Sequence, residues 1–276
     1  MEKEWLFGKT LGELAEVAAS FGMPRFTATQ IAAWIYRKGA LSIAEMTNIS
    51  LKNRRALEER YQVGRIPSAA VQQSADGTKK YLFPTLRDRF VESAYIPDGQ
   101  RATLCVSSQS GCRMGCRFCA STLLGLSRNL YPSEMLDQIY AIQKATGERV
   151  SHLVVMGTGE PFDNFESLCR MIELLCSPDG LNISHRNITV STCGIVPKIY
   201  EFADRNPQVT LAISLHSPND TMRRELMPIA NKYSMDELME AARYYTRTTG
   251  RRITFEYSLV KGVNDKKAVS YTHLRA

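Results

Sequence analysis

The sequence predicts an α/β protein in which parallel strands alternate with helices. Three observations carry this prediction: the first 65 residues read as helical, a short β-rich stretch follows, and apolar strand-like runs then alternate with helical periods. Strands that are separated by helices pair in parallel through right-handed crossovers. We therefore expect an N-terminal helical accessory domain over residues 1–65, a β linker over 66–97, and the main α/β domain over 98–267.

The N-terminal region has two candidate helix starts. Thr10 is followed by Glu13, and Thr27 by Gln30, which is the spacing of a capping box. A third helix is expected over Leu51–Tyr61. It carries four basic side chains that are equally well explained as a solvated helix face or as an RNA contact: Lys52, Arg54, Arg55 and Arg60.

The linker predicts two short strands, Lys80–Phe83 and Arg89–Ile96, as a small sheet between the two domains. Beyond it, the expected parallel strands are Thr103–Ser107, His152–Gly157, Asn187–Ser191, Thr210–His216 and Arg252–Val260. The expected helices between them are Pro132–Thr146, Phe165–Cys176, Val196–Asn206 and Met235–Thr249. In a barrel of this kind the chemistry gathers at the carboxyl ends of the strands.

Three cysteines follow the first of these strands with the spacing C-x₃-C-x₂-C: Cys112, Cys116 and Cys119. Iron–sulfur clusters usually take four thiolates, so three would leave one iron of a [4Fe–4S] cluster open for chemistry. The alternative is a structural zinc knuckle with Cys105 as a fourth thiolate. The chain has no second pair of C-x₂-C cysteines, which favours the cluster.

Polar motifs follow the next three predicted strands. Met156–Pro161 contains Gly159 and Glu160, where glycine permits close approach of a ligand and the carboxylate can accept a hydrogen bond from a ligand ammonium group. Ser191–Gly194 and Ser214–His216 end the following two strands. An isolated histidine is usually structural, but His216 stands in line with these motifs and is expected to face the same site.

The remaining cysteines divide into two kinds. Cys169 and Cys176 lie on an apolar helical stripe and are expected to be buried core thiols. Cys193 is ambiguous because it lies beside a ligand-loop motif. Cys105 is either a buried strand cysteine or a redox-active thiol near the reaction centre.

The cysteine triad, with Phe118 before its last cysteine, resembles the signature of radical S-adenosylmethionine (SAM) enzymes. Together with Arg101–Cys112, Met156–Pro161, Ser191–Gly194 and Ala212–Asp220, it resembles the RlmN family of bacterial RNA adenine-C2 methyltransferases. The resemblance implies a (β/α)6 radical SAM barrel, a [4Fe–4S] cluster and SAM as cofactors. It also implies methylation of C2 of an adenosine in 23S rRNA and in tRNA near the anticodon.

The resemblance also implies roles for individual residues. It makes Cys112, Cys116 and Cys119 the cluster ligands, and it places these residues at SAM: Gly159, Glu160, Ser191, Ser214, Leu215 and His216. It makes Glu92 the base that removes the C2 proton. Cys105 becomes the thiol that resolves a covalent adduct through a disulfide with a methyl-carrying cysteine. From the residues alone, Glu92 is only a strand carboxylate that faces solvent.

The chain departs from the family at its end. The family continues with a last strand, an asparagine that contacts SAM and the methyl-carrying cysteine, none of which follows here. Residues 268–276 do not continue the family pattern. We therefore expect a partial barrel, truncated before its last strand, that binds its cofactors but is inactive alone. Two other functions remain open: the related C8-adenine methyltransferases of the antibiotic-resistance branch, and a non-catalytic RNA-binding protein with a structural metal.

The composition indicates which partners and which cellular compartment suit this protein. The net charge of +7 suits a polyanionic partner such as RNA, and four basic pairs are candidate contacts: Arg54-Arg55, Lys79-Lys80, Arg223-Arg224 and Arg251-Arg252. No apolar run approaches the ~18 residues of a membrane span. The charged N-terminus lacks a signal-peptide core, and seven cysteines then favour a reducing compartment. We expect a cytoplasmic monomer that receives electrons from a donor such as flavodoxin.

Overall fold

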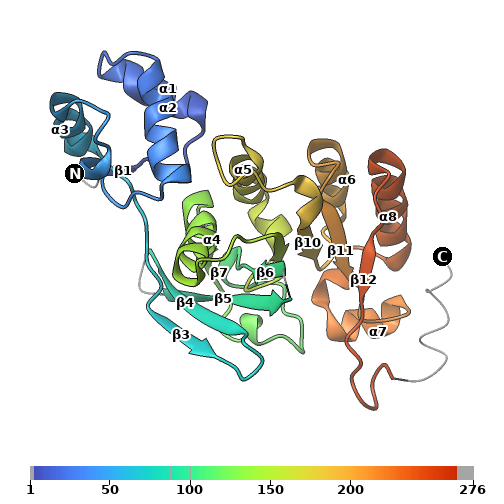
Figure 1. Ribbon diagram of the computed structural model, residues 1–276. Coiled ribbons are helices and arrows are strands. Elements are labelled where there is room, and N and C mark those ends of the chain that lie inside the picture. Colours follow the sequence, from blue (N-terminus) through green and yellow to red (C-terminus); the bar gives the residue numbers. More distant parts are fainter. Residues whose placement is uncertain (1–2, 87–88, 100, 266–276) are drawn as a thin grey trace.

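The structure is a computed structural model that describes residues 3–86, 89–99 and 101–265. Its centre is a curved sheet with the strand order β12-β11-β10-β9-β6-β5-β4-β3 (Figure 1). The strands β6, β9, β10, β11 and β12 pair in parallel, as expected. In chain order the strands of this sheet are β3 (Ala70–Gln73), β4 (Lys79–Thr85), β5 (Arg89–Asp98), β6 (Arg101–Cys105), β9 (His152–Val155), β10 (Ile188–Thr192), β11 (Thr210–Ser214) and β12 (Thr254–Glu256).

The linker strands belong to this same sheet. We expected a small sheet of their own, but β5 pairs antiparallel with β6, and Ala94 lies opposite Cys105. The strands β4 and β3 add on beyond β5 in antiparallel order. Because β6 would otherwise have an open edge with unpaired backbone groups, the hairpin from β5 to β6 extends the barrel wall.

The predicted helices pack between the strands and solvent on the outer side of the sheet, where Figure 1 shows them in a row. The structure confirms the predicted bounds of α4 (Pro132–Thr146), α5 (Phe165–Cys176) and α8 (Met235–Thr249). The helix α6 (Val196–Arg205) ends one residue earlier than predicted. A further short helix, α7 (Asp220–Leu226), was not predicted, because its seven residues are too few to show a clear helical period.

The N-terminal region is helical, with α1 (Leu11–Ser20), α2 (Phe26–Ala32), a π-helical turn over Ala33–Arg37 and α3 (Leu51–Arg60). A short parallel pair, β1 (Glu4–Trp5) and β2 (Tyr61–Gln62), closes it. The capping box at Thr10 is confirmed, since its backbone N–H donates to Glu13 at 2.7 Å and its hydroxyl accepts from the Glu13 N–H at 3.3 Å. The capping box expected at Thr27 is wrong, because α2 already begins at Phe26 and Thr27 is buried inside it.

The N-terminal region packs on the outer face of α4. The ring of Phe7 meets the ring of Tyr140 edge-on, with centroids 5.4 Å apart. The guanidinium group of Arg65 lies over both rings and forms a buried ion pair with Asp137 of α4. The accessory helices also reach α5, where Arg170 pairs with Glu13 at 2.8 Å, and the loop after α5, where Asp179 pairs with Arg37 at 3.3 Å. No helix among the described residues has the length and apolar character to cross a membrane.

Candidate active site at the barrel mouth

The cysteine loop is closed by a small hairpin that the sequence analysis did not predict. Its strands are β7 (Gln109–Gly111) and β8 (Leu126–Asn129). Gly111 has a φ of +77°, and a Cβ atom there would lie 2.0 Å from the carbonyl oxygen of Gly125. Only glycine allows this approach, which lets the Cys112 N–H donate to the Gly125 carbonyl at 3.1 Å. The hairpin thus fixes both ends of the loop that holds the three cysteines.

The three thiols lie in a protected environment at the mouth of the barrel. Cys112 and Cys116 are buried and Cys119 is half-buried. Burial, and then the neighbouring Cys112 and Cys119 groups, raises the pKa of Cys116 to about 12, and burial also raises the pKa of Cys112. Crowded, buried sulfur atoms that resist ionisation call for a metal centre to balance their charge as thiolates. This donor set fits an iron–sulfur cluster with three protein ligands.

The Gly157-Thr158-Gly159-Glu160 turn after β9 packs directly against this loop. Gly159 has a φ of +108°, and a Cβ atom there would lie 2.5 Å from the side chain of Gln109. Glu160 is 4% exposed, and its carboxylate accepts from the Phe162 N–H at 2.9 Å, the Thr192 hydroxyl at 2.7 Å and the Cys193 N–H at 2.7 Å. Burial raises the pKa of Glu160. The carboxylate is thus held by neutral donors only, which leaves it available to a cationic ligand group.

A second carboxylate in the site was missed by sequence reasoning. Glu256, at the end of β12, accepts from the hydroxyls of Ser191 at 2.6 Å and Ser214 at 3.1 Å. It thereby joins the ends of three neighbouring strands. The predicted strand Arg252–Val260 extends four residues beyond the observed end of β12 at Glu256. With the observed end, Glu256 is a polar residue at a strand end, like the three recognised motifs.

His216 and Leu215 follow β11 but face different surroundings. The backbone of His216 has a φ of +53°, and its Nδ1 atom accepts from the Ser258 N–H at 3.0 Å. Burial lowers the pKa of His216, so the imidazole is neutral at pH 7 and edge-on to Phe118 with centroids 4.7 Å apart. The side chain of Leu215 is buried in the core. Its backbone N–H donates to the Glu256 carbonyl at 3.0 Å, and its own carbonyl accepts from Arg223 at 3.3 Å.

A cavity of about 320 Å³ unites most of the predicted site residues. Cys193, which was ambiguous from the sequence, also lines it and packs beside Cys116. Within the described ranges, no three Cys, His, Asp or Glu side chains are arranged to hold a single metal ion. The predicted residues that line the cavity are Cys112, Cys116, Cys119, Gly159, Glu160, Ser191, Ser214 and His216.

Glu92 and Cys105 lie on the inner face of the sheet but outside the lining of this cavity. Cys105 pairs with Ala94, two residues after Glu92, so both side chains project from the same face. The intervening Ser93 projects the other way and donates to Gln138 of α4 at 2.5 Å. Glu92 is 53% exposed and forms an ion pair with Lys80 at 3.0 Å. Burial raises the pKa of Cys105, so this thiol is protonated at neutral pH.

The basic pairs proposed as RNA contacts are partly occupied with structural roles. Arg223 is fully buried behind the cysteine loop, where it donates to the Cys193 carbonyl at 2.7 Å and to the Leu215 and Ser214 carbonyls at 3.3 Å. Arg223 is therefore ruled out as a candidate RNA contact. Its neighbour Arg224 is exposed. The helix α7 turns one arginine into the core and leaves the next one outside, which adjacent positions on a helix permit.

All seven cysteines are free, so the structure holds no disulfide of the kind that the resemblance implies for Cys105. Cys169 is buried in α5, and its sulfur accepts from Asn206 at 3.4 Å. Cys176 packs at the edge of the same core. The prediction of a buried core thiol is confirmed for Cys169, whereas Cys176 is only half-buried.

Comparisons with known proteins agree with this architecture. Residues 106–274 match the family model of the Radical SAM superfamily, and residues 5–63 match that of the ribosomal RNA large subunit methyltransferase N-terminal domain. The crystal structure of a radical SAM methyltransferase from Sphaerobacter thermophilus superposes with a TM-score of 0.90 at 42% identity, over 96% of this chain and 79% of that one. The fold and site therefore define a radical SAM enzyme.

Two curated relatives specify the family. Both are described as a probable dual-specificity RNA methyltransferase RlmN. The protein of Lachnospira eligens is 57% identical over 92% of this chain and 73% of its own length. The protein of Clostridioides difficile strain 630 is 49% identical over 97% of this chain and 78% of its own length. The chain belongs to the RlmN family of radical SAM RNA methyltransferases, whose cofactors are a [4Fe–4S] cluster and SAM.

Proposed function

We propose that this RNA methyltransferase acts on C2 of an adenosine, in 23S rRNA and in tRNA near the anticodon. The observation that carries the proposal is its identity of 57% to a probable dual-specificity RNA methyltransferase, combined with a cavity that gathers the cysteine loop and the strand-end motifs. An electron donor such as flavodoxin, a monomeric state and a cytoplasmic location stay predictions.

In this proposal each part of the cavity has a separate task. Cys112, Cys116 and Cys119 hold the cluster, which together with SAM supplies one-electron chemistry when bound. The carboxylates of Glu160 and Glu256 face a cofactor that carries two cationic groups, an ammonium and a sulfonium. Because both carboxyl groups are held by neutral hydrogen-bond donors only, neither is already paired with a cation of the protein and both can pair with the cationic groups of SAM.

Glu92 and Cys105 act on the RNA base in this proposal. Both project from the inner face of the sheet, which supports their reaching one substrate. Glu92 is exposed, and its carboxylate can accept the C2 proton once its contact with Lys80 opens. Cys105 must lose its proton before it can attack a covalent adduct, because the thiolate is the nucleophile.

The cysteines of these 276 residues lie between Cys105 and Cys193. Six of them have a place in the cluster loop, the core or the cavity, and Cys105 is assigned to the RNA base in this proposal. We therefore propose that none of them carries the methyl group and that residues 1–276 bind the cofactors without turnover. A catalytic sample would be a chimaera in which the C-terminal part of the L. eligens relative follows Asn264.

The test is mass spectrometry of nucleosides from a 23S rRNA transcript incubated anaerobically with SAM and reductant. The chimaera should form 2-methyladenosine and residues 1–276 alone should not. Formation of 8-methyladenosine would instead assign the C8 branch. A chimaera that binds cluster and SAM but modifies no adenosine would refute the proposed function, and 2-methyladenosine from residues 1–276 would refute the assignment of the cysteines.

A further inference from the structure

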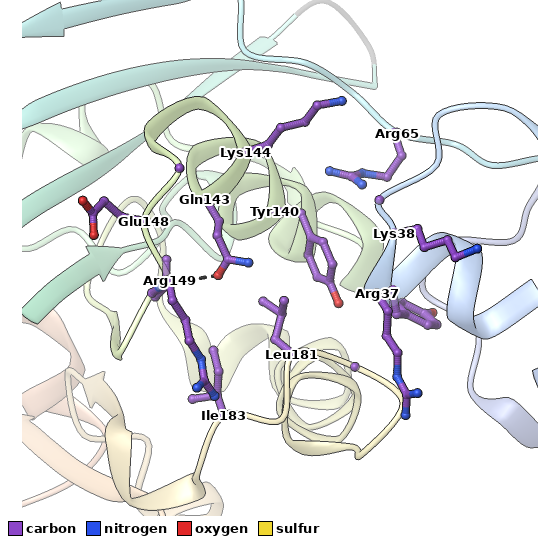
Figure 2. A pocket seen from close by; sticks show the side chains of 15 residues that line it. Arg37, Lys38, Arg65, Tyr140, Gln143, Lys144, Glu148, Arg149, Leu181 and Ile183 are labelled. Atoms are coloured by element: carbon purple, nitrogen blue, oxygen red, sulfur yellow. Dashed lines mark hydrogen bonds between the residues drawn. The ribbon is translucent and has the colours of Figure 1, made fainter. Parts of the chain in front are cut away.

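A second cavity lies far from the cluster loop, between the N-terminal helical region and the rear end of α4. Its volume is about 560 Å³. It opens beside the C-terminal end of α4, whereas the cluster loop leads into the N-terminal end of that helix. Since α4 has 15 residues, the two ends are about 22 Å apart. Figure 2 shows that the lining residues come from the N-terminal region, from α4 and from the loops that follow α4 and α5, with the side chains of Lys144 and Arg149 extending to different sides of Tyr140.

The lining of this cavity carries more positive than negative charge. Its basic residues are Arg37, Lys38, Arg65, Lys144 and Arg149, and its acidic residue is Glu148. Two of the cations are already matched, because Arg65 pairs with Asp137, and Arg37 pairs with Asp179 at 3.3 Å. Neither Lys144 nor Arg149 forms an ion pair with a carboxylate of the described residues. These two cations at the rim can therefore bind an external anion.

A buried hydroxyl points to a ligand independently of these charges. Tyr140 is 7% exposed, and its hydroxyl has no hydrogen-bond partner among the described residues. Figure 2 shows this hydroxyl directed into the cavity, toward the side on which Leu181 and Arg37 lie. Burial raises the pKa of Tyr140, so the hydroxyl keeps its proton and can donate. Buried polar atoms nearly always have a partner, and an exception calls for an explanation such as a missing ligand.

Tyr36 also lines this cavity, and its buried hydroxyl, unlike that of Tyr140, has hydrogen-bond partners. Its oxygen accepts from the Gly8 N–H at 3.0 Å and donates to the Lys9 carbonyl at 2.6 Å. Tyr36 is therefore part of the packing between the N-terminal region and α4. Tyr140 contributes its ring to that packing but leaves its donor to the cavity. Helix-dipole effects would account for Lys144 in the last turn of α4, but not for this hydroxyl.

We propose that this cavity binds a backbone phosphate of the RNA substrate, with Lys144, Arg149 and the Tyr140 hydroxyl as donors. Arg, Lys and Tyr are common donors to phosphate oxygens, and such contacts position an RNA without reading its sequence. The apolar side chains of Leu181 and Ile183 offer a surface for the adjoining ribose. The choice of RNA rather than a free phosphorylated compound rests on the proposed function. Binding here would hold the RNA about one helix length away from the modified base.

The first test measures the affinity of the full chain for an unmodified tRNA transcript by fluorescence anisotropy over a range of salt concentrations. The double substitution Lys144→Gln and Arg149→Gln should weaken binding and reduce the slope of log affinity against log salt by about 1 to 2. The matched control replaces Arg243 and Arg247 with Gln, because both are exposed on α8 and the net charge changes equally. Equal losses in the two double variants would overturn the proposal, since they would reflect net charge alone.

The second test removes only the hydroxyl, with Tyr140→Phe. The variant should bind the tRNA transcript several-fold more weakly while its melting temperature stays equal or rises, because a buried donor without a partner is lost. A purely structural tyrosine would give the reverse pattern, with a lower melting temperature and unchanged affinity. That pattern would overturn the role of Tyr140.

Free anions are distinguished by titrating AMP and inorganic phosphate and following the melting temperature. One outcome would overturn the RNA proposal: AMP or phosphate raises the melting temperature of the wild-type chain but not that of the Lys144→Gln, Arg149→Gln variant, while the wild-type chain and the variant bind tRNA with equal affinity. The cavity would then bind a free anion. These readouts are separate from catalysis. A chimaera that binds tRNA through this cavity but yields no 2-methyladenosine contradicts the proposed function and leaves the cavity proposal standing.

Discussion

The two cavities beyond the two ends of α4 carry opposite charge. The mouth cavity is lined by thiols and by the carboxylates of Glu160 and Glu256, which have neutral hydrogen-bond donors and no cationic partner in the cavity lining. The rear cavity is lined by Lys144 and Arg149, which have no carboxylate partner among the described residues, and by one hydroxyl without a partner. The charged side chains of both cavities therefore lack the ion-pair partners that many other charged side chains of the protein have. The difference indicates a cationic cofactor at the mouth and an anionic ligand at the rear.

The largest expected effect comes from the cysteine loop. Cys116→Ala should abolish the brown colour and the iron content after anaerobic reconstitution, because two thiolates do not hold a [4Fe–4S] cluster firmly. The matched control is Cys176→Ala, since Cys176 packs at the edge of the core on α5. Iron and acid-labile sulfide analysis measures the result. A Cys116→Ala protein with the iron content of the control would rule out Cys116 as a ligand.

The next effect separates two adjacent arginines behind the mouth. Arg223→Met should lower the free energy of unfolding by about 3 kcal/mol or more, because it removes the donor of three buried carbonyl groups. Arg224→Met should change it by less than about 0.5 kcal/mol, since Arg224 is exposed. Urea denaturation compares the two. Equal destabilisation would mean that the buried guanidinium group is not what holds the ends of β10 and β11 to α7.

A smaller effect tests the negative charge of the mouth. Glu256→Gln keeps an acceptor for the Ser191 and Ser214 hydroxyls but removes the charge, so SAM affinity should fall about tenfold, or about 1.4 kcal/mol. Glu240→Gln on the exposed side of α8 is the control. Equilibrium dialysis of the reconstituted protein measures both. If SAM binds the two variants equally well, the charge of Glu256 has no part in recognising the cofactor.

The smallest effect concerns the joint between the N-terminal region and α4. Burial raises the pKa of Asp137 to about 6 from the usual 3.8, although Arg65 opposes this. The folded chain therefore binds a proton more readily than the unfolded chain between about pH 4 and pH 6. The contribution of Asp137 to stability is greatest below this window and is lost as the pH rises through it, with a slope of at most about 1.4 kcal/mol per pH unit.

Urea denaturation at several pH values between 4 and 7 measures this dependence. Asp137→Asn should flatten the slope, because the amide does not titrate but can still accept from the Ile66 N–H that Asp137 binds at 2.8 Å. Asp204→Asn, at an exposed position on α6, should leave it unchanged. A slope that is the same in both variants would show that Asp137 does not titrate in this range.

Much of the barrel could be predicted because its signals are local. Helices such as α4 and α8 combine an amphipathic period with a start signal and a glycine after the last turn, so their bounds follow from neighbouring residues. The predicted capping box at Thr27 failed because the chain enters α2 through the turn at Pro24, whose carbonyl accepts from the Thr27 N–H at 2.9 Å. Burial of the threonine then decided its role.

Most of the residues that line the mouth cavity could also be predicted from local sequence signals. Cysteine spacing and strand-end motifs gave residues that the structure gathers around one cavity, because strand ends of a parallel sheet meet at one edge. Glu256 was missed because the end of β12 depends on pairing with β11, at Ser214, and not on its own residues. The roles of Glu92 and Cys105 stay predictions.

The sequence by itself determined the alternation of strands and helices and the three thiols that a cluster requires, since both are written in residues close together in the chain. The tertiary structure alone decided which charges are buried and which are left without a partner. Arg223 and Arg224 are adjacent and chemically identical, yet one holds three carbonyl groups in the core and the other faces water. Such differences arise because the cost of burying a charge depends on groups that folding brings in from distant parts of the chain.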